Sequence, residues 1–537
     1  STGMYAKYGI LNNDTAGKIT MGDSSTAMYG RDDTIVTNKG TVAIGSDSTG
    51  LYSEDTDQPI TNDGTITSSG NNSIAVSYKP KAISAAGIDM LKNTGTITMT
   101  GDKNVGLYAT EGAAATYNVL NTGTITMGDS ASLSNPNVAI YTDNANHTLS
   151  NGGTVTVGKN SIGLYGYKSD NSGNISVGNG GIGIYSQGGD VNLNGGTITT
   201  GSDEAVGVYT VGSGQNITNS GTAFNLGDNS FGFVNVGSGN TITSTISNIG
   251  LGNNSVYVYS NDAAGTVVNN TAISSTGNQN YGLYSAGTVN NNAVIDLSNG
   301  KGNVGIYSVG GGTAINNSSI IVGASDSKND LFSIGMGAGY STTDHGTIIN
   351  KGTITVNGKD SIGMYASGAG SQAINDTGAT ITLNANNTTG IYADNGATAI
   401  NRGTITTSGS HSKVVGVYLG KDATLNNTGT IHIDSDNGTG IYLKGGKVAN
   451  YGTITVDGGA TKEAEFTTPP TGKEVGGVNI NAPAGATRAT ITRNGNPVTP
   501  VTISNVVGQR NPLTSSIGMY VDTLRGTNPI GGLIPSG

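Results

Sequence analysis

Polar and apolar residues alternate in short runs along this chain, most regularly as Thr-Ile-Thr. A period of two residues predicts a half-buried strand, and the β-branched residues in these runs suit a pleated surface. We find no stretch with a convincing helical period. The runs belong to a recurring motif, Asn-x-Gly-Thr-(Ile/Val)-Thr, whose Asn and Gly indicate a turn before each strand. It occurs at residues 62–67, 93–98, 121–126, 151–156, 401–406 and 450–455.

A second motif, Gly-aliphatic-Tyr, returns about every 25 residues, which lies within the period range of solenoid repeats. Looser copies at residues 27–29, 139–141 and 257–259 fill most of the gaps, and degenerate repeats lie near Tyr78, Val234 and Gly337. Leucine-rich repeats have a similar period, but each of their units needs several leucines and a helical or 3₁₀ arc, which this chain lacks. The triplets occur at residues 3–5, 50–52, 106–108, 163–165, 183–185, 207–209, 282–284, 305–307, 363–365, 390–392, 416–418, 440–442 and 518–520.

The two motifs combine into one repeat with three short strands, at residues 398–400, 404–406 and 415–418. Within it, Ile405 is expected to point inward. In the third strand, alternation predicts that Val415 and Val417 point inward and that Gly416 and Tyr418 point outward. Three strands and three turns per coil describe an all-β protein, a single-stranded parallel β-helix of about 20 coils.

Equivalent residues of successive coils should stack on one another, as they do in other in-register β arrays. About 20 coils at about 4.8 Å each predict a rod on the order of 95 Å long. We also expect one continuous buried isoleucine column, formed by Ile66, Ile97, Ile125, Ile354, Ile405 and Ile454.

Composition narrows the classes of function. The 537 residues include no cysteine, which excludes disulfides and thiolate metal sites. A net charge of −10 argues against nucleic-acid and anionic-membrane partners, which need basic patches. No apolar run is long enough for a transmembrane helix, and no signal peptide opens the chain. Since the chain starts in the middle of a repeat, we expect a fragment of a longer protein.

The repeat breaks once, between residues 442 and 520, where a charged cluster occurs and Pro469, Pro470, Pro483, Pro497 and Pro500 fall close together. An Asn494-Gly495 pair between strand-like residues indicates a hairpin. The sequence therefore predicts β-helix coils over 1–460, an excursion over 461–512 that is most simply a strand pair, and a last coil over 513–537. The flanking coils, ending near Val456 and resuming near Leu513, should then stack directly.

The stacked motifs, together with residues 515–525 and 527–530, resemble the passenger of a large type Va autotransporter adhesin of the fusobacterial kind. That family includes arginine-inhibitable and galactose-binding adhesins. The resemblance implies a right-handed β-helix on the cell surface. It also implies an autochaperone region and a C-terminal β-barrel in the outer membrane, neither of which lies in this sequence. The expected partners are cell-surface protein or glycan receptors on other microbes or host cells, with the chain itself a monomeric rod.

Catalytic motifs are weak. Gly22-Asp23-Ser24-Ser25 and Gly128-Asp129-Ser130-Ala131 resemble nucleophile motifs, but related sequences recur as turns of the repeat. The four histidines are scattered over many coils, and the acidic groups at 54–57 and 434–438 are best explained as solvated turns. We therefore expect no enzymatic activity, no catalytic residue, no cofactor and no metal. A purely structural spacer and, more remotely, a carbohydrate-active enzyme remain as alternatives.

Candidate binding residues come from two features. The tyrosine column is either a structural stacking ladder or an exposed aromatic strip for sugars. Long repeats, at 79–81, 111–117, 131–137 and 324–330, should form outward loops, which often carry binding in solenoids. The predicted binding residues are Lys79, Lys81, Tyr117, Tyr165, Tyr185 and Tyr209.

Overall fold

The computed structural model describes residues 1–81, 84–109, 116–340 and 342–457, and beyond them only the backbone of six short strands. The chain divides into two units. The first contains Ser1–Ile249 and Ser255–Asp262, and the second contains Gly250–Asn254 and Ala263–Gly537. The described residues contain no helix, and thus none that could cross a membrane.

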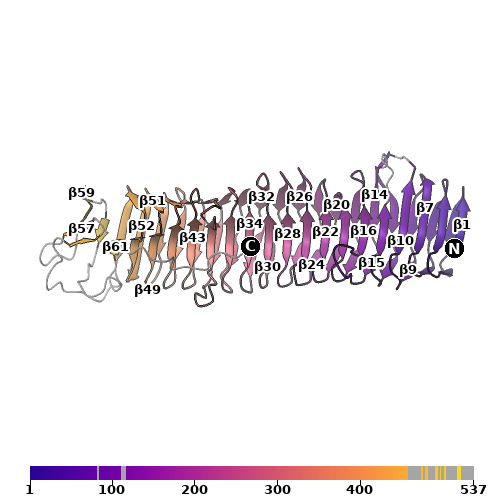
Figure 1. Ribbon diagram of the computed structural model, residues 1–537, viewed down its shortest axis with the longest axis horizontal. Coiled ribbons are helices and arrows are strands. Elements are labelled where there is room, and N and C mark those ends of the chain that lie inside the picture. Colours follow the sequence, from indigo (N-terminus) through magenta and orange to yellow (C-terminus); the bar gives the residue numbers. More distant parts are fainter. Residues whose placement is uncertain are drawn as a thin grey trace. The chain divides into compact units, whose positions relative to one another are not determined.

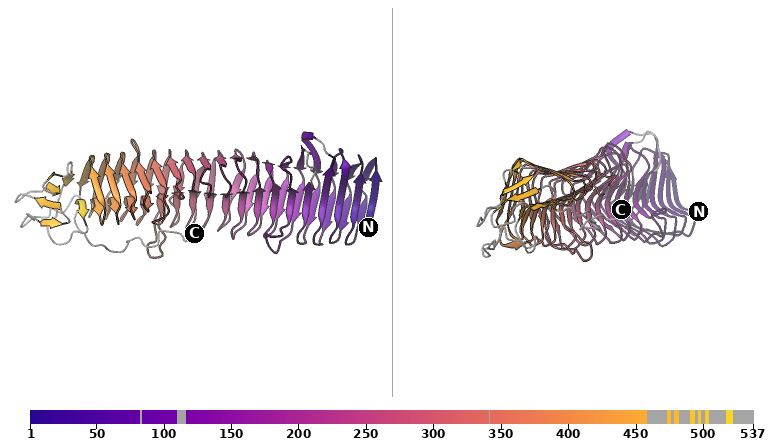
Figure 2. Two further views of the ribbon diagram at one scale, coloured as in Figure 1. Left: turned by 45° about the horizontal axis from the view of Figure 1, so that its top comes forward. Right: turned by 60° about the vertical axis from the view of Figure 1, so that its left-hand side comes forward.

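The strands of the coils line three sides, which we name the tyrosine, asparagine and isoleucine sheets after their most regular residue (Figures 1 and 2). Among the described strands the isoleucine sheet is divided into a 9-stranded and an 11-stranded part. The tyrosine strands of the first unit are β1 (Thr2–Lys7), β4 (Thr26–Arg31), β7 (Thr49–Thr56), β10 (Ile74–Pro80), β13 (Val105–Ala109), β16 (Val138–Thr142), β19 (Ile162–Gly166), β22 (Ile182–Ser186), β25 (Val206–Thr210), β28 (Phe231–Asn235) and β31 (Val256–Ser260).

The asparagine strands of the first unit are β2 (Ile10–Asn13), β5 (Ile35–Asn38), β8 (Ile60–Asn62), β11 (Ser84–Asn93), β14 (Thr116–Asn121), β17 (Thr148–Asn151), β20 (Lys168–Asn171), β23 (Val191–Leu193), β26 (Asn216–Asn219) and β29 (Thr241–Ser244). Its isoleucine strands are β3 (Lys18–Thr20), β6 (Thr41–Ile44), β9 (Thr65–Ser68), β12 (Thr96–Met99), β15 (Thr124–Met127), β18 (Thr154–Val157), β21 (Asn174–Val177), β24 (Thr197–Thr200) and β27 (Ala223–Asn225). Strand β30 (Asn248–Leu251) spans the division between the units.

The second unit repeats the arrangement. Its tyrosine strands are β34 (Tyr281–Ser285), β37 (Val304–Ser308), β40 (Ile334–Ala338), β43 (Ile362–Ser367), β46 (Thr389–Asp394), β50 (Val415–Leu419), β53 (Thr439–Leu443) and β61 (Ile517–Val521). Its asparagine strands are β32 (Thr266–Asn269), β35 (Thr288–Asn291), β38 (Thr313–Asn316), β41 (Thr347–Asn350), β44 (Gln372–Asn375), β47 (Thr398–Asn401), β51 (Thr424–Asn427) and β54 (Lys447–Asn450). Its isoleucine strands are β33 (Ala272–Ser275), β36 (Ile295–Leu297), β39 (Ser319–Val322), β42 (Thr353–Val356), β45 (Thr380–Leu383), β48 (Thr404–Thr407), β52 (Thr430–Asp436), β55 (Thr453–Asp457) and β60 (Val501–Ile503), with β49 (His411–Ser412) beside β52.

The predicted fold class is confirmed: the protein is an all-β parallel solenoid with three strands per coil. The described part of the chain includes 19 tyrosine strands, close to the expected number of coils. The predicted burial of the isoleucines is also confirmed, but they form two ladders and not one continuous column: Ile66, Ile97 and Ile125 belong to a 9-stranded sheet, and Ile354, Ile405 and Ile454 to an 11-stranded sheet. Equivalent residues pair in register, as Ile97 does with Ile125, and all six are fully buried. Burial of one such side chain contributes about 1.5–3 kcal/mol.

Buried asparagines form a second column at the end of the asparagine strands. In the first unit, the Nδ2 of Asn93 donates to the Oδ1 of Asn121 at 2.8 Å, and that of Asn121 donates to Asn151 at 2.8 Å. The same bond recurs from Asn13 to Asn171, and in the second unit from Asn269 to Asn450. Each amide in these runs therefore satisfies its neighbour in the next coil, and the column is interrupted where Leu193 and Ser244 occupy the equivalent position.

One prediction about side-chain direction was wrong. Gly416 faces the interior, since a Cβ placed there would lie 2.6 Å from the buried Ile431 side chain. Val415 instead packs outside, against the ring of Tyr418. The order of the four residues is therefore out, in, in, out. Strict alternation fails because two successive residues, Gly416 and Val417, turn inward, and glycine makes this local irregularity possible.

Beyond residue 457 the chain is described only by its strands. Strands β56 (Lys473–Val475), β57 (Val478–Asn481), β58 (Thr490–Arg493) and β59 (Asn496–Pro497) form a small antiparallel sheet. Strand β61 pairs with β53 in register, with Tyr442 opposite Tyr520, and β60 pairs with β55. The rest of 461–512 and of 513–537 lies outside the described residues, so the boundaries at 460 and 512 stay predictions.

Candidate functional site

The outer face of the tyrosine sheet in the first unit carries a groove of about 700 Å³, which we name the tyrosine groove. Its strands are β13 to β25, drawn in purple in Figure 1. One side is a row of tyrosine rings, the floor is a row of aliphatic side chains, and a loop forms a wall. The lining residues are Val105, Tyr108, Leu133, Ser134, Asn135, Pro136, Val138, Tyr141, Ile162, Tyr165, Ile182, Tyr185 and Tyr209.

The inward glycine of each strand explains how the groove is built. In Ile182-Gly183-Ile184-Tyr185, Gly183 and Ile184 point inward, so Ile182 and Tyr185 both lie on the outer face. Val138, Ile162, Ile182, Val206 and Val234 form a nearly buried aliphatic cluster there, and the tyrosine rings pack against it. The groove is therefore a consequence of the repeat itself.

The tyrosine rings are stacked along the coils. Ring centroids are 5.1 Å apart between Tyr141 and Tyr165, 4.8 Å between Tyr165 and Tyr185 and 5.5 Å between Tyr185 and Tyr209, with interplanar angles of 12°, 2° and 6°. Offset stacking of this kind stabilises each pair by about 0.5–1.5 kcal/mol. Because neighbouring rings cover one another's faces, the groove presents ring edges and hydroxyl groups.

Those hydroxyl groups are available. The phenol oxygens of Tyr141, Tyr165, Tyr185 and Tyr209 have no hydrogen-bond partner among the described residues. Ladder tyrosines elsewhere differ: the hydroxyl of Tyr52 donates to Glu54 at 2.8 Å, and that of Tyr307 donates to the carbonyl of Gly339 at 2.9 Å. The groove therefore offers a row of groups that can both donate and accept a hydrogen bond.

The electrostatic character of the groove is neutral. None of the described residues that line it is charged, although the chain carries a net charge of −10. Burial raises the pKa of Tyr141 to about 12, and also raises the pKa values of Tyr165 and Tyr185. These three phenols thus stay protonated at physiological pH.

The wall of the groove is the loop that precedes β16. Its base is fixed, because the Nδ2 of Asn137 donates to the carbonyls of Gly128 and Gly101, at 2.9 and 3.0 Å, and its backbone N–H donates to Ser130 Oγ at 2.6 Å. Leu133, near the middle of the loop, is 42% exposed. An exposed leucine on an anchored loop beside a groove is a feature that packing of the coil does not require.

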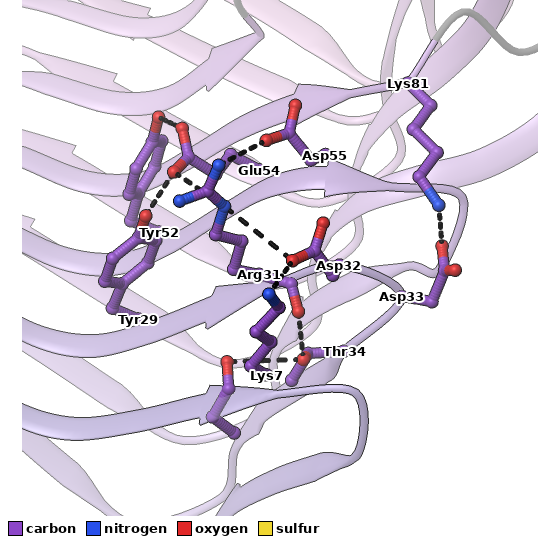
Figure 3. A network of polar contacts seen from close by, with 11 residues as sticks. Lys7, Tyr29, Arg31, Asp32, Asp33, Thr34, Tyr52, Glu54, Asp55 and Lys81 are labelled. Carbon is purple, nitrogen blue, oxygen red and sulfur yellow. Dashed lines mark hydrogen bonds and ion pairs between the residues drawn. The ribbon is translucent and has the colours of Figure 1, made fainter.

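A second feature is a charged corner at the ends of β1, β4, β7 and β10, which Figure 3 shows. Arg31 lies among Asp32, Glu54 and Asp55, with its Nη2 3.4 Å from the Asp55 carboxylate. Lys7 pairs with Asp32 at 3.3 Å. Exposed pairs of this kind contribute little to stability, because solvent screens them. The corner therefore links successive coils, and its acids are neutralised by the bases between them.

Glu54 is the best-connected acid of the charged corner. It accepts hydrogen bonds from the hydroxyls of both Tyr29 and Tyr52. Burial acts to raise the pKa of Glu54, but these two bonds and the nearby Arg31 outweigh it, so the net direction is downward. Burial and the bond to Glu54 raise the pKa of Tyr29 to about 12. The carboxylate is therefore held ionised, as a structural anchor for the first rings of the ladder.

The structure separates the predicted site residues into three groups. Tyr165, Tyr185 and Tyr209 line the groove together. Lys81 belongs to the charged corner, where its Nζ lies 2.7 Å from Asp33, and Lys79 is exposed nearby on β10. The lysines and the tyrosines thus lie in different places, and only the tyrosines share a groove.

Tyr117 is a correction. It was expected on an outward loop, but it is only 1% exposed and points into the coil, as the alternating burial of β14 requires. Its ring packs edge-on against Tyr78, with centroids 5.3 Å apart, and lies 3.9 Å from the ring of His147. Tyr78 has likewise turned inward, and Ser77 occupies its place in the ladder. Tyr117 is therefore a core residue.

Sequence reasoning missed Tyr108, Tyr141 and the wall residue Leu133. The two tyrosines carry the same motif as Tyr165, and the loop 131–137 had been recognised as a long repeat. What the sequence did not show is that this loop lies beside those rings. The serine motifs are turns: the Oδ1 of Asp129 accepts from the N–H of Lys159 at 2.7 Å, and that of Asp23 accepts from Ser46 at 2.7 Å.

Comparison with known proteins gives one match. The family model described as the BigA third pectate lyase-like domain matches three overlapping stretches, residues 46–209, 167–376 and 369–485. No curated protein and no solved structure matches. The three matches together cover well over half of the chain and include every strand that lines the groove. The chain therefore belongs to the family of the BigA third pectate lyase-like domain.

Proposed function

We propose that the chain is a segment of the passenger of a bacterial cell-surface adhesin of the autotransporter kind, and that the tyrosine groove is its attachment surface. The observation that carries the proposal is the row of open phenol hydroxyls in an uncharged groove. A BigA-like domain suggests a protein of the bacterial surface, and the resemblance to fusobacterial adhesin passengers supports the same assignment.

Two features favour attachment over catalysis. The groove has hydroxyls, amides and apolar groups, which suit reversible recognition of an uncharged surface. The densest group of acids lies in the charged corner, where Arg31, Lys7 and Lys81 pair with them, and not among the described residues that line the groove. Polysaccharide hydrolysis needs two carboxylates that face one scissile bond.

In this proposal, the β-helix is both the scaffold and the binding element. The receptors are proteins or glycans on the surface of other microbes or host cells. The passenger is tethered to the outer membrane by parts of the protein that lie outside this sequence. The finer assignment, to adhesins of the fusobacterial kind, rests on the repeat motifs and on residues 515–530.

The test is attachment of the purified, labelled chain to panels of bacterial and host cells. The triple variant Tyr165→Phe, Tyr185→Phe, Tyr209→Phe removes three hydroxyls but keeps the stacked rings. We expect it to bind at least about tenfold more weakly, since each lost hydrogen bond contributes about 0.5–1.5 kcal/mol. The matched control is Tyr365→Phe, a buried ladder tyrosine of the second unit. Equal attachment of the triple variant and the wild-type chain would refute the assignment of the groove.

A purely structural spacer is the second candidate. The asparagine column and the stacked rings favour it, because both recur in each unit and need no ligand. A spacer predicts no attachment to any cell type. It also predicts that shortening the chain by whole coils changes reach but not affinity, whereas removal of the coils of β13 to β25 should abolish attachment by an adhesin.

A further inference from the structure

We propose that the tyrosine groove binds the tyrosine groove of a second copy of this chain, in antiparallel orientation. The inference rests on the proposed attachment function of the groove and names its partner. It replaces the expectation of a monomer. Three observations lead to it: the period of the groove, the chemistry of its hydroxyls and the position of its wall.

The period of the groove restricts the partner. Ring centroids repeat every 4.8–5.5 Å over Tyr108, Tyr141, Tyr165, Tyr185 and Tyr209. A rigid partner that contacts all five rings must repeat its own groups at the same interval. An extended peptide advances about 3.3 Å per residue, and a polyproline helix about 3.1 Å, so neither stays in register with successive rings. A second copy of the groove has the same ring spacing and therefore repeats at the required interval.

The hydroxyl groups are self-complementary. A carboxylate row can only accept hydrogen bonds and an ammonium row can only donate them, so either would repel its own copy. A phenol hydroxyl does both, and those of Tyr141, Tyr165, Tyr185 and Tyr209 have no partner among the described residues. Two such rows that face one another can satisfy each other completely.

Charge favours the same face. Two copies of a chain with a net charge of −10 repel at most approaches. The described residues of the groove carry no charge, and its floor is a row of nearly buried aliphatic side chains. Contact at the groove therefore removes apolar surface from water without bringing carboxylates together.

The wall fits a two-fold arrangement. Antiparallel pairing places a symmetry axis near Tyr165 on β19, the middle ring of the row. Strand β16 of one copy then faces β22 of the other. The exposed Leu133, on the loop that precedes β16, meets the coil of Tyr185 in the second copy, where no such wall occurs among the lining residues. Each copy thus inserts its wall at the open end of the other, as an isologous interface requires.

The test uses sedimentation velocity and a single-cysteine crosslink, which is unambiguous because the chain has no cysteine. The wild-type chain should form a dimer whose proportion rises with concentration. Leu133→Asp changes only an exposed side chain and should weaken the dimer at least about tenfold, since it places an unpaired carboxylate in an apolar contact.

Tyr165→Cys should crosslink to itself with a bifunctional thiol reagent about 10 Å long, the spacing of two facing sheets. Tyr29→Cys is the control, because it occupies the same ladder position outside the groove. Equal crosslinking at both positions, or dimers unaffected by Leu133→Asp, would overturn the proposal.

The outcomes for the two proposals are separable. A chain that stays monomeric at every concentration but attaches to cells through the groove refutes self-association and leaves the adhesin function standing. In that case, titration of neutral oligosaccharides and cell-surface proteins identifies the other occupant. A chain that dimerises through the groove but attaches to no cell, including cells that display the same chain, supports the interface and refutes attachment.

Discussion

The buried asparagine column allows a quantitative prediction at Asn121. Its side chain is fully buried and makes three hydrogen bonds. Its Nδ2 donates to Asn151 Oδ1 at 2.8 Å and to the carbonyl of Gly123 at 3.3 Å, and its Oδ1 accepts from Asn93 Nδ2 at 2.8 Å. The prediction compares Asn121→Ala, which removes all three bonds, with Asn121→Asp, which keeps the shape and removes the donor.

Asn121→Ala should destabilise its coil by about 3 kcal/mol, because three bonds contribute about 0.5–1.5 kcal/mol each and two amide groups lose a partner. Asn93 Nδ2 retains the carbonyl of Gly95 at 3.2 Å, which limits the loss on that side. At neutral pH, Asn121→Asp should destabilise the coil more than Asn121→Ala does, because a buried carboxylate then faces two acceptor oxygens.

The aspartate variant should also depend on pH. Burial and the facing acceptors raise the pKa of the introduced carboxyl above its unfolded value. The protonated form can donate to Asn151, so the loss of stability is present at neutral pH and is relieved as the pH falls through the folded-state pKa. The wild-type chain and Asn121→Ala carry no titrating group at this position and should show no such local recovery.

Amide hydrogen exchange is the suitable assay, since a solenoid loses stability coil by coil and has no single unfolding free energy. In Asn121→Ala, the amides of Thr122 and Gly152, which donate to Asn93 and Asn121 at 2.9 and 2.8 Å, should exchange about 100-fold faster. Asn292→Ala, whose bond to Asn270 is exposed, is the control and should change exchange little. Unchanged exchange near Asn121, or a uniform change over the whole unit, would refute the reasoning.

Three further predictions follow from burial and charge. Ile405→Asp should open the neighbouring coils and create protease sites there, because an unpaired charge enters the core, whereas Thr406→Asp should not. A cleavage pattern of Ile405→Asp that is the same as that of the wild-type chain would count against the buried isoleucine position. Burial raises the pKa values of Tyr29 and Tyr141 to about 12, so the stability that these protonated phenols contribute should be fully present below pH 10 and should be lost as the pH rises through about 12. Phenolate absorption and circular dichroism, recorded together, test this prediction. The hydrogen bond from Lys81 lowers the pKa of Asp33 in the folded chain. The contribution of this bond to folding stability is therefore present above the ordinary carboxyl pKa and is lost as the pH falls through the folded-state pKa of Asp33. In an NMR titration, Lys81→Met should remove this dependence on acid.

The coil architecture was predictable because almost every repeat carries the same strand and turn motifs. Thr-Ile-Thr gives an inward isoleucine by alternation, and the asparagine at the start of the motif falls at the turn where its amide can reach the next coil. Errors in single repeats do not alter the path, since neighbouring coils impose the register. Ile97 and Ile125 pair in the structure as this reasoning requires.

The groove was only partly predictable. Alternation predicts the wrong face of the sheet for Val415 and Gly416. The structure departs from alternation because Gly416 and Val417, two successive residues, both point inward. Tyr78 lies one position after the ladder position, which Ser77 occupies, and Tyr117 lies at an inward position of β14, so a tyrosine count cannot reveal that both are core residues. The wall could not be predicted because the path of loop 131–137 depends on bonds from Asn137 to two other turns.

Footprinting of the chain bound to cells tests the attachment surface most directly. A reagent that modifies accessible tyrosines is applied to the cell-bound chain and to the free chain at a concentration at which it is monomeric, and each tyrosine is quantified by mass spectrometry. Tyr165, Tyr185 and Tyr209 should be protected on binding, while Tyr451, which is 76% exposed and lies in the second unit, should react equally in both states. Protection elsewhere, with the three groove tyrosines as reactive as in the free chain, would contradict the account.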